Sequence, residues 1–598
     1  MNINGKHPNF LIITTDEERF PPPYENLEAK DYRLRNSESL LQMRQHGIEF
    51  INHNAASTAC APSRTSIYTG QYPSLHGVSQ TPGIGKSSFD QNMFWLEPNT
   101  VPTMGSWFRE AGYQTYYRGK WHLSDEDILV PGTQQALVSN SISGEPYPQR
   151  VELYQHADRL DKFGFSQWIG PEPHGSAENN CGTVRDPGFA RQVCETLLML
   201  DKQAQHEDAP PFLLVSSFVN PHDIVLPRQK DWFEEFYQLK AAGALPNVDP
   251  APSQYESLQS KPRCQKDYLY TYPHMYLPQP TTEAYRQFYY YLMAEVNKHI
   301  TSVYETLKQT SLFDNTIVVF TSDHGELLGA HGGLHQKWYT AYQEVLNVPF
   351  IISNPNLFKR SSQLDITTSH VDLLPTLLGL AGVDKEQIRQ NLAENHSEAR
   401  PLVGRDLSRI LLGEQAPNEE PIYFMTSDNV EVGSDMTNPA TGVAYNSIIQ
   451  PNHIEAIVTK LPELTGDTRW KYVRYYDSAR FYSDTGVIDD FEEDDHNVGR
   501  QDSRYDLSHL VASGNPDDIT TTRFIPSEFE CYNLSDDPTE ENNLLSPLCP
   551  NPVDNNVLAA LKTVMKEQRL NKRLLPHNDN KEVEYRRGED TLIIPIRS

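Results

Sequence analysis

Apolar runs and amphipathic segments alternate along the first two thirds of the chain, a pattern typical of an α/β fold. Four apolar runs predict buried strands, and each breaks off into charged or imidazole side chains at its carboxyl end. They cover residues 9–17, 112–123, 211–223 and 315–326. Because ligands bind at the carboxyl ends of strands in an open α/β sheet, we expect these four ends to meet at one site.

Two amphipathic segments predict helices that cover this sheet. In residues 283–310, apolar side chains recur at steps of three or four from Tyr285 to Leu307, which is the spacing of one helix face. We interpret the tyrosines of this segment as core residues, because an apolar stripe at helical spacing is usually buried. Residues 370–383 predict a second covering helix.

The pattern changes after about residue 415. Short strands are predicted at residues 453–460 and 469–477, followed by a helix around residues 555–568. We therefore expect two domains. The first, residues 1–415, is an α/β domain with a large mixed, mostly parallel sheet flanked by helices, and it should carry the active site. The second, residues 416–598, is a smaller α+β domain with an extended tail.

Composition and charge restrict the class of ligand. Of the 598 residues, 38% are hydrophobic and 10% aromatic, which supports packed cores and excludes a disordered chain. Lys and Arg number 51 against 80 Asp and Glu, and the net charge of −29 argues against a nucleic-acid or anionic-membrane surface. A local basic pocket must therefore hold any anionic ligand. The acidic run at residues 489–495 is interpreted as a solvated loop, with a surface cation site as the alternative.

Targeting signals are not apparent in the sequence. We find no signal peptide at the start and no apolar run of about 18 residues that could cross a membrane. The six cysteines are scattered and form no C-x-x-C pair, which supports neither a disulfide scaffold nor a zinc site. A reducing, cytoplasmic setting is the simplest expectation. The apolar tail at residues 591–598 favours burial against the body of the chain or a neighbouring subunit, and thus a homo-oligomer.

Cys60 lies where a helix is predicted to begin. Pro62 suits the first turn of a helix, so residue 60 would sit at the positive helix terminus, which favours an anion or a nucleophile. A phosphatase that uses the thiolate directly needs its arginine at position 66, which is a serine here, and the arginine is Arg64. The thiol-nucleophile interpretation is thereby weakened. A buried structural thiol and half of a disulfide are the remaining simple alternatives.

The residues around Cys60 match C-x-P-S-R followed by x-x-x-x-T-G, the signature of the type I sulfatases of the alkaline-phosphatase-like superfamily. The matching residues are Cys60, Pro62, Ser63, Arg64, Thr69 and Gly70. Further blocks in family order lie at residues 119–123, 220–223, 321–326, 335–338 and 532–544. The chain therefore resembles this family over most of its length. The resemblance implies that a formylglycine-generating enzyme oxidises Cys60 to Cα-formylglycine, an aldehyde that hydrates to a geminal diol.

Four residues at the predicted strand ends suit a metal ion. Asp16 and Glu17 end the first strand, and Asp323 and His324 end the fourth. Carboxylate oxygens and one imidazole suit a divalent cation such as Ca²⁺, with Mn²⁺ or Mg²⁺ as alternatives. The resemblance implies that these are the four metal positions, with the diol of residue 60 completing the shell. Glu17 departs from the pattern, because many sulfatases have a second aspartate, and its extra methylene could move it off the metal.

Five further side chains are expected to complete the catalytic site: Arg64, Lys120, His122, His222 and Lys337. A sulfate monoester is an anion, so cations must cover its charge and an acid must serve the leaving oxygen. We expect Arg64 and Lys120 to hold the diol and the transferring group. Lys337 and His222 should lie on the side of the ester-bridge oxygen. His331 and His335 lie in the same loop region and are weaker candidates for substrate contact.

The expected mechanism uses both hydroxyls of the diol. The metal and Asp323 help to deprotonate one hydroxyl of residue 60, which attacks sulfur. His222 or Lys337 donates to the departing oxygen, and His122 takes the proton of the second hydroxyl so that sulfate leaves and the aldehyde returns.

Three functions remain open at this point. The first is hydrolysis of a small aryl, alkyl or sugar sulfate. The second is a phosphonate monoester or phosphodiester hydrolase that uses the same site. The third is a catalytically silent binding module, which predicts gaps among the functional positions. The loops at residues 125–185 and 225–280 match no known pattern and are expected to choose the leaving group.

Overall fold

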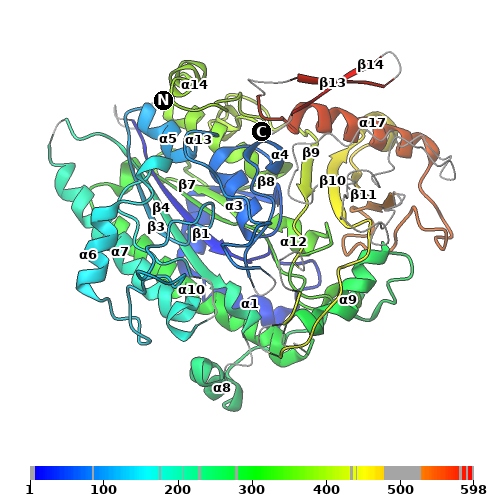
Figure 1. Cartoon of the computed structure of the whole chain (residues 1–598), viewed down its shortest axis with the longest axis horizontal. Helices are drawn as coiled ribbons and strands as arrows, with labels where there is room; N and C mark the ends of the chain where they lie inside the picture. Colours follow the sequence, from blue (N-terminus) through cyan, green and yellow to red (C-terminus); the bar gives the residue numbers. More distant parts are fainter. Residues whose placement is uncertain are drawn as a thin grey trace.

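The computed structural model describes residues 7–83, 86–173, 177–206, 208–226, 230–276, 280–430, 436–438, 441–476, 527–577, 582–587 and 590–595. Its centre is an eight-stranded mixed sheet (Figure 1). The strands are β1 (Asn9–Asp16), β2 (Gly47–Asn54), β3 (Gln114–Gly119), β4 (Phe212–Pro221), β5 (Thr316–Ser322), β6 (Asn347–Val348), β7 (Phe350–Ser353) and β8 (Ser362–Ser369). The predicted α/β fold class is confirmed.

The strand order brings the four predicted strands together. The sheet runs β3-β4-β1-β5-β7-β2-β6, and β8 pairs with β2. Strands β3, β4, β1 and β5 are parallel neighbours, so their carboxyl ends lie at one edge. The register sets Asp16 opposite Pro221 and Thr15 opposite Ser322. The residues that follow these strands therefore meet, as the sequence predicted.

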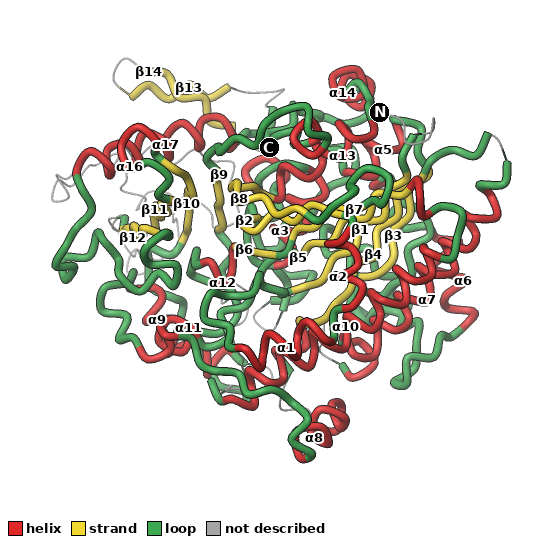
Figure 2. The backbone as a smooth tube through the Cα atoms, turned by 180° about the vertical axis from the view of Figure 1, so that it is seen from behind, coloured by secondary structure: helices red, strands yellow, loops and turns green. Residues whose placement is uncertain are grey.

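Helices cover both faces of the sheet (Figures 1 and 2). On one face lie α3 (Cys60–Thr69), α5 (Met104–Glu110) and α13 (Leu373–Ala381), and on the other lie α2 (Glu38–Gln45), α7 (Gly182–Gln203) and α10 (Glu283–Lys308). Strand β1 shows the two-residue period that this requires, because Phe10 and Ile12 face one core while Leu11 and Ile13 face the other. The sheet is buried on both sides.

The two predicted covering helices are present. Helix α10 ends two residues before the predicted 283–310 segment does, and the apolar residues of its stripe are buried from Tyr285 to Leu307. Its tyrosines are core residues, as predicted. In the 370–383 segment, residues 370–372 form a 3₁₀ turn, and α13 begins only at Leu373.

A second, antiparallel sheet follows in the chain. Its order is β12-β11-β10-β9, with β9 (Ile422–Thr426), β10 (His453–Lys460), β11 (Arg469–Tyr476) and β12 (Glu528–Asn533). Helix α17 (Asn555–Lys572) packs on this sheet, and a hairpin of β13 (Glu582–Arg587) and β14 (Asp590–Pro595) follows. Side chains of the second sheet share core clusters with Ala56, Ala59 and Tyr72, which flank α3, so the second sheet packs against the first part of the chain. The domain boundary at residue 415 stays a prediction.

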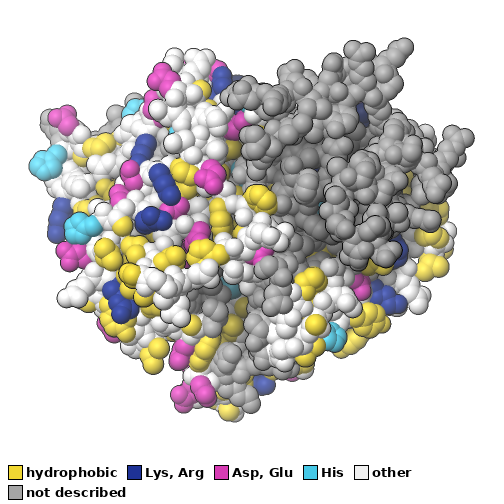
Figure 3. Space-filling model, in the orientation of Figure 1, with side chains coloured by type: hydrophobic (Ala, Val, Ile, Leu, Met, Phe, Trp, Pro, Cys, Tyr) yellow, Lys and Arg dark blue, Asp and Glu magenta, His cyan; other side chains and the backbone are white. Residues whose placement is uncertain are grey.

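Several global expectations can be compared with the described residues. Among the helices in these ranges, none combines the length and the apolar character of a membrane span. All six cysteines are free thiols, which agrees with the expected lack of a disulfide scaffold. Acidic and basic side chains are interspersed on the face shown in Figure 3. The acidic run at residues 489–495 and the side chains of the tail at residues 591–598 lie outside the described set.

Candidate active site

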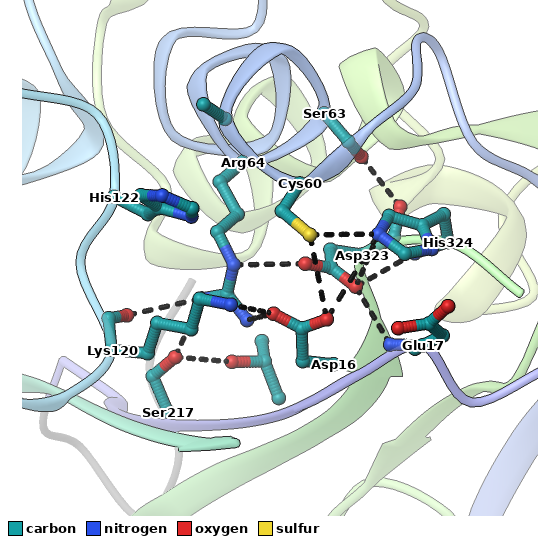
Figure 4. A network of polar contacts seen from close by, with 12 residues as sticks. Asp16, Glu17, Cys60, Ser63, Arg64, Lys120, His122, Ser217, Asp323 and His324 are labelled. Atoms are coloured by element: carbon teal, nitrogen blue, oxygen red, sulfur yellow. Dashed lines mark hydrogen bonds and ion pairs between the residues drawn. The ribbon is translucent and has the colours of Figure 1, made fainter. Parts of the chain in front are cut away.

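Cys60 is the first residue of α3, and every residue of this helix is buried. Gly70 ends the helix in the left-handed region, with φ 63°, where glycine carries no steric cost. The helix lies over the carboxyl edge of the sheet, so its amino terminus and Cys60 point toward the strand ends (Figure 4). The predicted helix start is confirmed. The thiol is 1% exposed and therefore lies inside the protein.

Three of the predicted metal ligands surround this thiol. Asp16 closes β1, and Asp323 and His324 directly follow β5. One ligand atom from each of these residues and the sulfur of Cys60 all lie within 4.8 Å of one another. The sulfur is 3.1 Å from His324 Nε2 and 3.6 Å from Asp16 Oδ1. The group is buried, and it holds two carboxylates that need positive charge nearby.

Two cations supply that charge. Arg64 donates from Nε to Asp323 Oδ2 at 2.8 Å and from a terminal nitrogen to Asp16 Oδ2 at 3.1 Å. Lys120 Nζ lies 2.6 Å from the same oxygen of Asp16. Burial would raise the pKa of Asp16, but the charges of Lys120 and Arg64 hold it well below its usual range. Asp16 is therefore a carboxylate, the form that can bind a cation.

Glu17 lies apart from this group. Its Oε2 accepts from Lys337 Nζ at 3.0 Å, and with Asp16 and His222 it forms a second set of potential ligands. Burial raises the pKa of Glu17 well above its usual value, against the opposing charge of Lys337, and the neighbouring carboxyl of Glu326 adds to the rise. The structure thus brings Glu17 and Lys337 together as a pair beside the Asp16 group. Glu17 as a metal ligand stays a prediction.

Both predicted proton carriers are placed on turns after the parallel strands. His122 follows β3, and His222 opens a 3₁₀ turn directly after β4. His222 shares its ligand set with Asp16 and Glu17. Burial and the charge of Lys120 lower the pKa of His222 well below its usual value, so the ring is neutral. The structure therefore gathers all ten predicted site residues at one edge of the sheet.

Comparison with known proteins identifies the family. The model of the sulfatase family matches residues 8–383, more than half of the chain. The chain belongs to the sulfatase family. Choline-sulfatase of Rhizobium meliloti is 26% identical over 392 residues, which cover 64% of this chain and 69% of that protein. The uncharacterized sulfatase YidJ of Escherichia coli (strain K12) is 28% identical over 396 residues, with the same two coverages.

Solved structures share the fold of this sulfatase-family chain at low identity. A 2-O GAG sulfatase superposes with a TM-score of 0.55 at 18% identity, covering 95% of this chain and 93% of the other. A phosphonate monoester hydrolase from Silicibacter pomeroyi superposes with a TM-score of 0.55 at 17% identity, covering 95% and 96%. The alkaline-phosphatase-like architecture expected from the sequence is confirmed.

Ser63, a residue of the family signature, contacts the end of strand β5. Ser63 Oγ donates to the backbone oxygen of Asp323 at 2.5 Å and lies 3.3 Å from His370 Nδ1. The other ring nitrogen of His370 contacts the backbone oxygen of Ser322 at 3.0 Å. Ser63 and His370 thus fix the strand end that carries Asp323. The sequence analysis missed His370, although it opens the predicted 370–383 segment.

The second sheet also reaches the candidate site. Asp428, two residues after β9, accepts from the backbone N–H of Ala59 at 3.1 Å, and its other oxygen accepts from Thr81 N at 3.2 Å. Thr426 donates to the backbone oxygen of Thr58. The residues directly before Cys60 are therefore held from the second sheet. No local pattern marks Asp428 or Thr426, so sequence reasoning missed both.

The thiol itself is a poor nucleophile in this setting. Burial raises the pKa of the Cys60 thiol well above its ordinary value, and the charge of Asp16 acts in the same direction. Cysteines that act as nucleophiles have lowered pKa values instead. The unmodified side chain is therefore a neutral thiol, which agrees with the weakened thiol-nucleophile interpretation.

The two weaker histidine candidates have other surroundings. His331 is fully buried, with Nδ1 at 2.9 Å from Glu256 and Nε2 at 3.4 Å from Glu344. Both ring nitrogens of His331 therefore contact glutamates of the protein itself. His335 stacks on Tyr272, with ring centroids 4.8 Å apart.

Proposed function

We propose that this chain hydrolyses sulfate monoesters and that the reaction takes place at residue 60. The observation that carries the proposal is the position of Cys60: it lies at the amino terminus of a buried helix, among Asp16, Asp323 and His324. Relatives are named for choline, aryl and sugar sulfates. The substrate class proposed here is therefore a small aryl, alkyl or sugar sulfate.

The donor set fits a divalent cation. Two buried carboxylates and an imidazole are hard and borderline ligands of the kind that Ca²⁺, Mn²⁺ or Mg²⁺ accept. Asp16, Asp323 and His324 would hold the ion, and Glu17 is the fourth proposed ligand. When bound, the cation would supply a positive centre that polarises oxygens of the ester.

Residue 60 is proposed to act after oxidation of its thiol to an aldehyde by a formylglycine-generating enzyme. The neutral, buried thiol of Cys60 supports this proposal, because a thiolate is not favoured in its setting. The hydrated aldehyde would supply a hydroxyl as nucleophile in place of sulfur.

The remaining residues have two proposed roles: some bind the charge of the transferring group, and others transfer protons. Arg64 and Lys120 bind the transferring group, since both already contact the carboxylates next to residue 60. Lys337 and His222 serve the leaving oxygen. Burial lowers the pKa of Lys337, but the nearby carboxylates of Glu17 and Asp16 raise it above its usual value, so its ammonium stays charged. His122 accepts the proton of residue 60 when sulfate leaves.

Parallel kinetics test the substrate class. The assay compares an aryl sulfate, an aryl phosphonate monoester and a phosphodiester under the same conditions. We expect the highest kcat/KM for the sulfate. If the sulfate were the poorest of the three by several decades, the phosphonate monoester or phosphodiester hydrolase would replace the proposal. No turnover of any ester would favour the silent binding module.

Mass spectrometry tests the state of residue 60. Active protein should yield a Cys60 peptide lighter than the cysteine form by the exchange of thiol for aldehyde, and this peptide should react with a hydrazine reagent. Activity should scale with the modified fraction, and Cys60→Ala should be inactive with an intact fold. Full turnover by protein that carries only unmodified cysteine would contradict the proposal.

A further inference from the structure

The turn after β3 carries two of the proposed active residues, Lys120 and His122, without regular secondary structure. Gly119 precedes it with φ 104°, and a Cβ atom there would lie 1.8 Å from the backbone oxygen of Ser217. His122 itself has φ 65°, a left-handed conformation that is sterically unfavourable for a non-glycine residue. Such a backbone persists only when surrounding contacts hold it.

Backbone hydrogen bonds fix the first part of this turn. The N–H of Lys120 donates to Ser217 O at 3.0 Å. The carbonyl oxygen of Lys120 accepts from Arg64 at 3.0 Å and from the hydroxyl of Tyr117 at 2.6 Å. Two more backbone N–H groups of the turn, those of Trp121 and His122, also need acceptors. Their hydrogen bonds fix the backbone position from which the His122 side chain extends.

A single carboxylate oxygen takes both of these N–H groups. Oε1 of Glu172 accepts from Trp121 N at 2.8 Å and from His122 N at 3.2 Å. Glu172 is buried, and its own backbone is anchored on both sides. Its N–H donates to Asp127 Oδ1 at 2.7 Å, and its carbonyl oxygen accepts from Asn180 Nδ2 at 2.6 Å. Glu172 is thus a fixed acceptor that reaches the turn from about fifty residues away along the chain.

The end of β4, directly before the turn that carries His222, has a similar support. Asp186, in helix α7, accepts from Val219 N with Oδ1 at 2.7 Å and from Asn220 N with Oδ2 at 3.0 Å. In return, the carboxylate of Asp223 accepts from two N–H groups at the start of α7, those of Gly182 and Thr183, both at 2.8 Å. His222 lies between these two fastened segments.

We propose that Glu172 and Asp186 are positioning residues, Glu172 for His122 and Asp186 for His222. The proposal rests on the proposed function for the roles of the two histidines. Displacement of His122 slows the release of sulfate, and displacement of His222 slows departure of the leaving group. Both carboxylates lie between residues 172 and 186, so one short stretch of chain would control both steps.

The geometry predicts different effects of conservative substitutions. Both N–H groups share one oxygen of Glu172, so Glu172→Gln can keep both bonds through its amide oxygen. Asp186 uses one oxygen for each N–H group, so Asp186→Asn must direct an NH₂ group at a donor and lose one bond. Glu172→Gln and Asp186→Asn are both acid-to-amide changes, so each variant is a matched control for the other.

Hydrogen exchange measured by mass spectrometry tests the positioning without any turnover. We expect Glu172→Ala to increase exchange in the peptide with residues 119–123 and to leave the peptide with residues 218–223 unchanged. Asp186→Asn should do the reverse, and Glu172→Gln should change neither. Uniform loss of protection over both peptides in every variant would overturn the proposal, because it would indicate general unfolding.

Kinetics with a series of substituted phenyl sulfates test the consequence. With 4-nitrophenyl sulfate, Glu172→Ala should show a burst of nitrophenol and a steady-state rate lowered by roughly 10- to 100-fold. Glu172→Gln should stay within about 3-fold of the unsubstituted protein, because its amide oxygen can accept from both N–H groups. Asp186→Asn should show no burst but a steeper dependence of rate on the pKa of the leaving phenol.

Two outcomes separate the inference from the function on which it rests. If the unsubstituted protein hydrolyses no aryl, alkyl or sugar sulfate but the exchange results hold, the proposed function fails and the positioning stands. If sulfates are hydrolysed and Glu172→Ala retains the full rate without a burst, the positioning proposal is wrong.

Discussion

His331 offers a sharp test of the electrostatics around the site. The ring is fully buried between Glu256 and Glu344. Burial would lower the pKa of His331, but the charge of Glu344 and hydrogen bonds with both glutamates raise it to about 9. His331 has φ 50°, so His331→Asn is the appropriate change, because asparagine tolerates the left-handed region. The variant removes the charge and keeps the backbone.

The magnitude follows from the difference between the folded and unfolded pKa values. A rise from 6.5 to about 9 corresponds to about 3 kcal/mol of differential stabilisation of the charged form. Because the folded pKa is the higher one, this stabilisation is fully present below pH 6.5 and is lost as the pH rises through 9. Between pH 7 and 9.5, the protein should therefore lose about 2 kcal/mol of unfolding free energy relative to His331→Asn.

The assay is urea unfolding of the unsubstituted protein and of His331→Asn at pH 7 and pH 9.5. At each pH, the unfolding free energy of the variant is subtracted from that of the unsubstituted protein, and the two differences are compared. His76→Asn is the matched control. Burial lowers the pKa of His76 to about 3, so this ring is neutral over the whole range and its substitution should have a constant effect. An equal difference between the protein and His331→Asn at both pH values would refute the charged state of His331.

Two further predictions concern the metal. A chelator should abolish turnover, and so should Asp323→Ala, while circular dichroism shows an intact fold; full activity of metal-free protein would contradict the assignment. Glu17→Gln should lower kcat because the ion pair with Lys337 is lost. Calorimetric titration of the metal then decides the role of Glu17: a loss of affinity beyond about 10-fold makes it a ligand, and a smaller change makes it a partner of Lys337 only.

The sequence predicted the strand ends well because they depend on local pattern and on one geometric rule. Each buried strand is an apolar run with a polar end, and parallel neighbours place those ends at one edge. Asp16, Lys120, His222 and Asp323 could therefore be grouped from the order of residues alone. The rule needs only the identity of the strands, not the contacts of their side chains.

The residues that hold the site in place could not be found in this way. Asp428 lies 369 positions from Ala59, and Glu172 lies 50 from His122. Such contacts depend on how loops cross the sheet edge, and a buried carboxylate that accepts from backbone N–H groups has the same sequence appearance as a surface acid. The second sheet illustrates the limit, because its strands were predicted but its contact with the residues before Cys60 was not.

Residue type alone does not show whether Glu17, at the carboxyl edge of the sheet, is a metal ligand or a partner of Lys337. Sequence position places it next to Asp16, as a metal ligand would be, and its carboxylate is chemically suited to that task. In the structure, its backbone N–H donates to Asp323 Oδ1 at 3.0 Å while its side chain reaches Lys337. The backbone of Glu17 has φ 72°, and its carboxylate lies within 4.8 Å of ligand atoms of Asp16 and His222. An aspartate at this position would be one methylene shorter, so the longer glutamate can contact Lys337 from the strand end that is proposed to hold the cation.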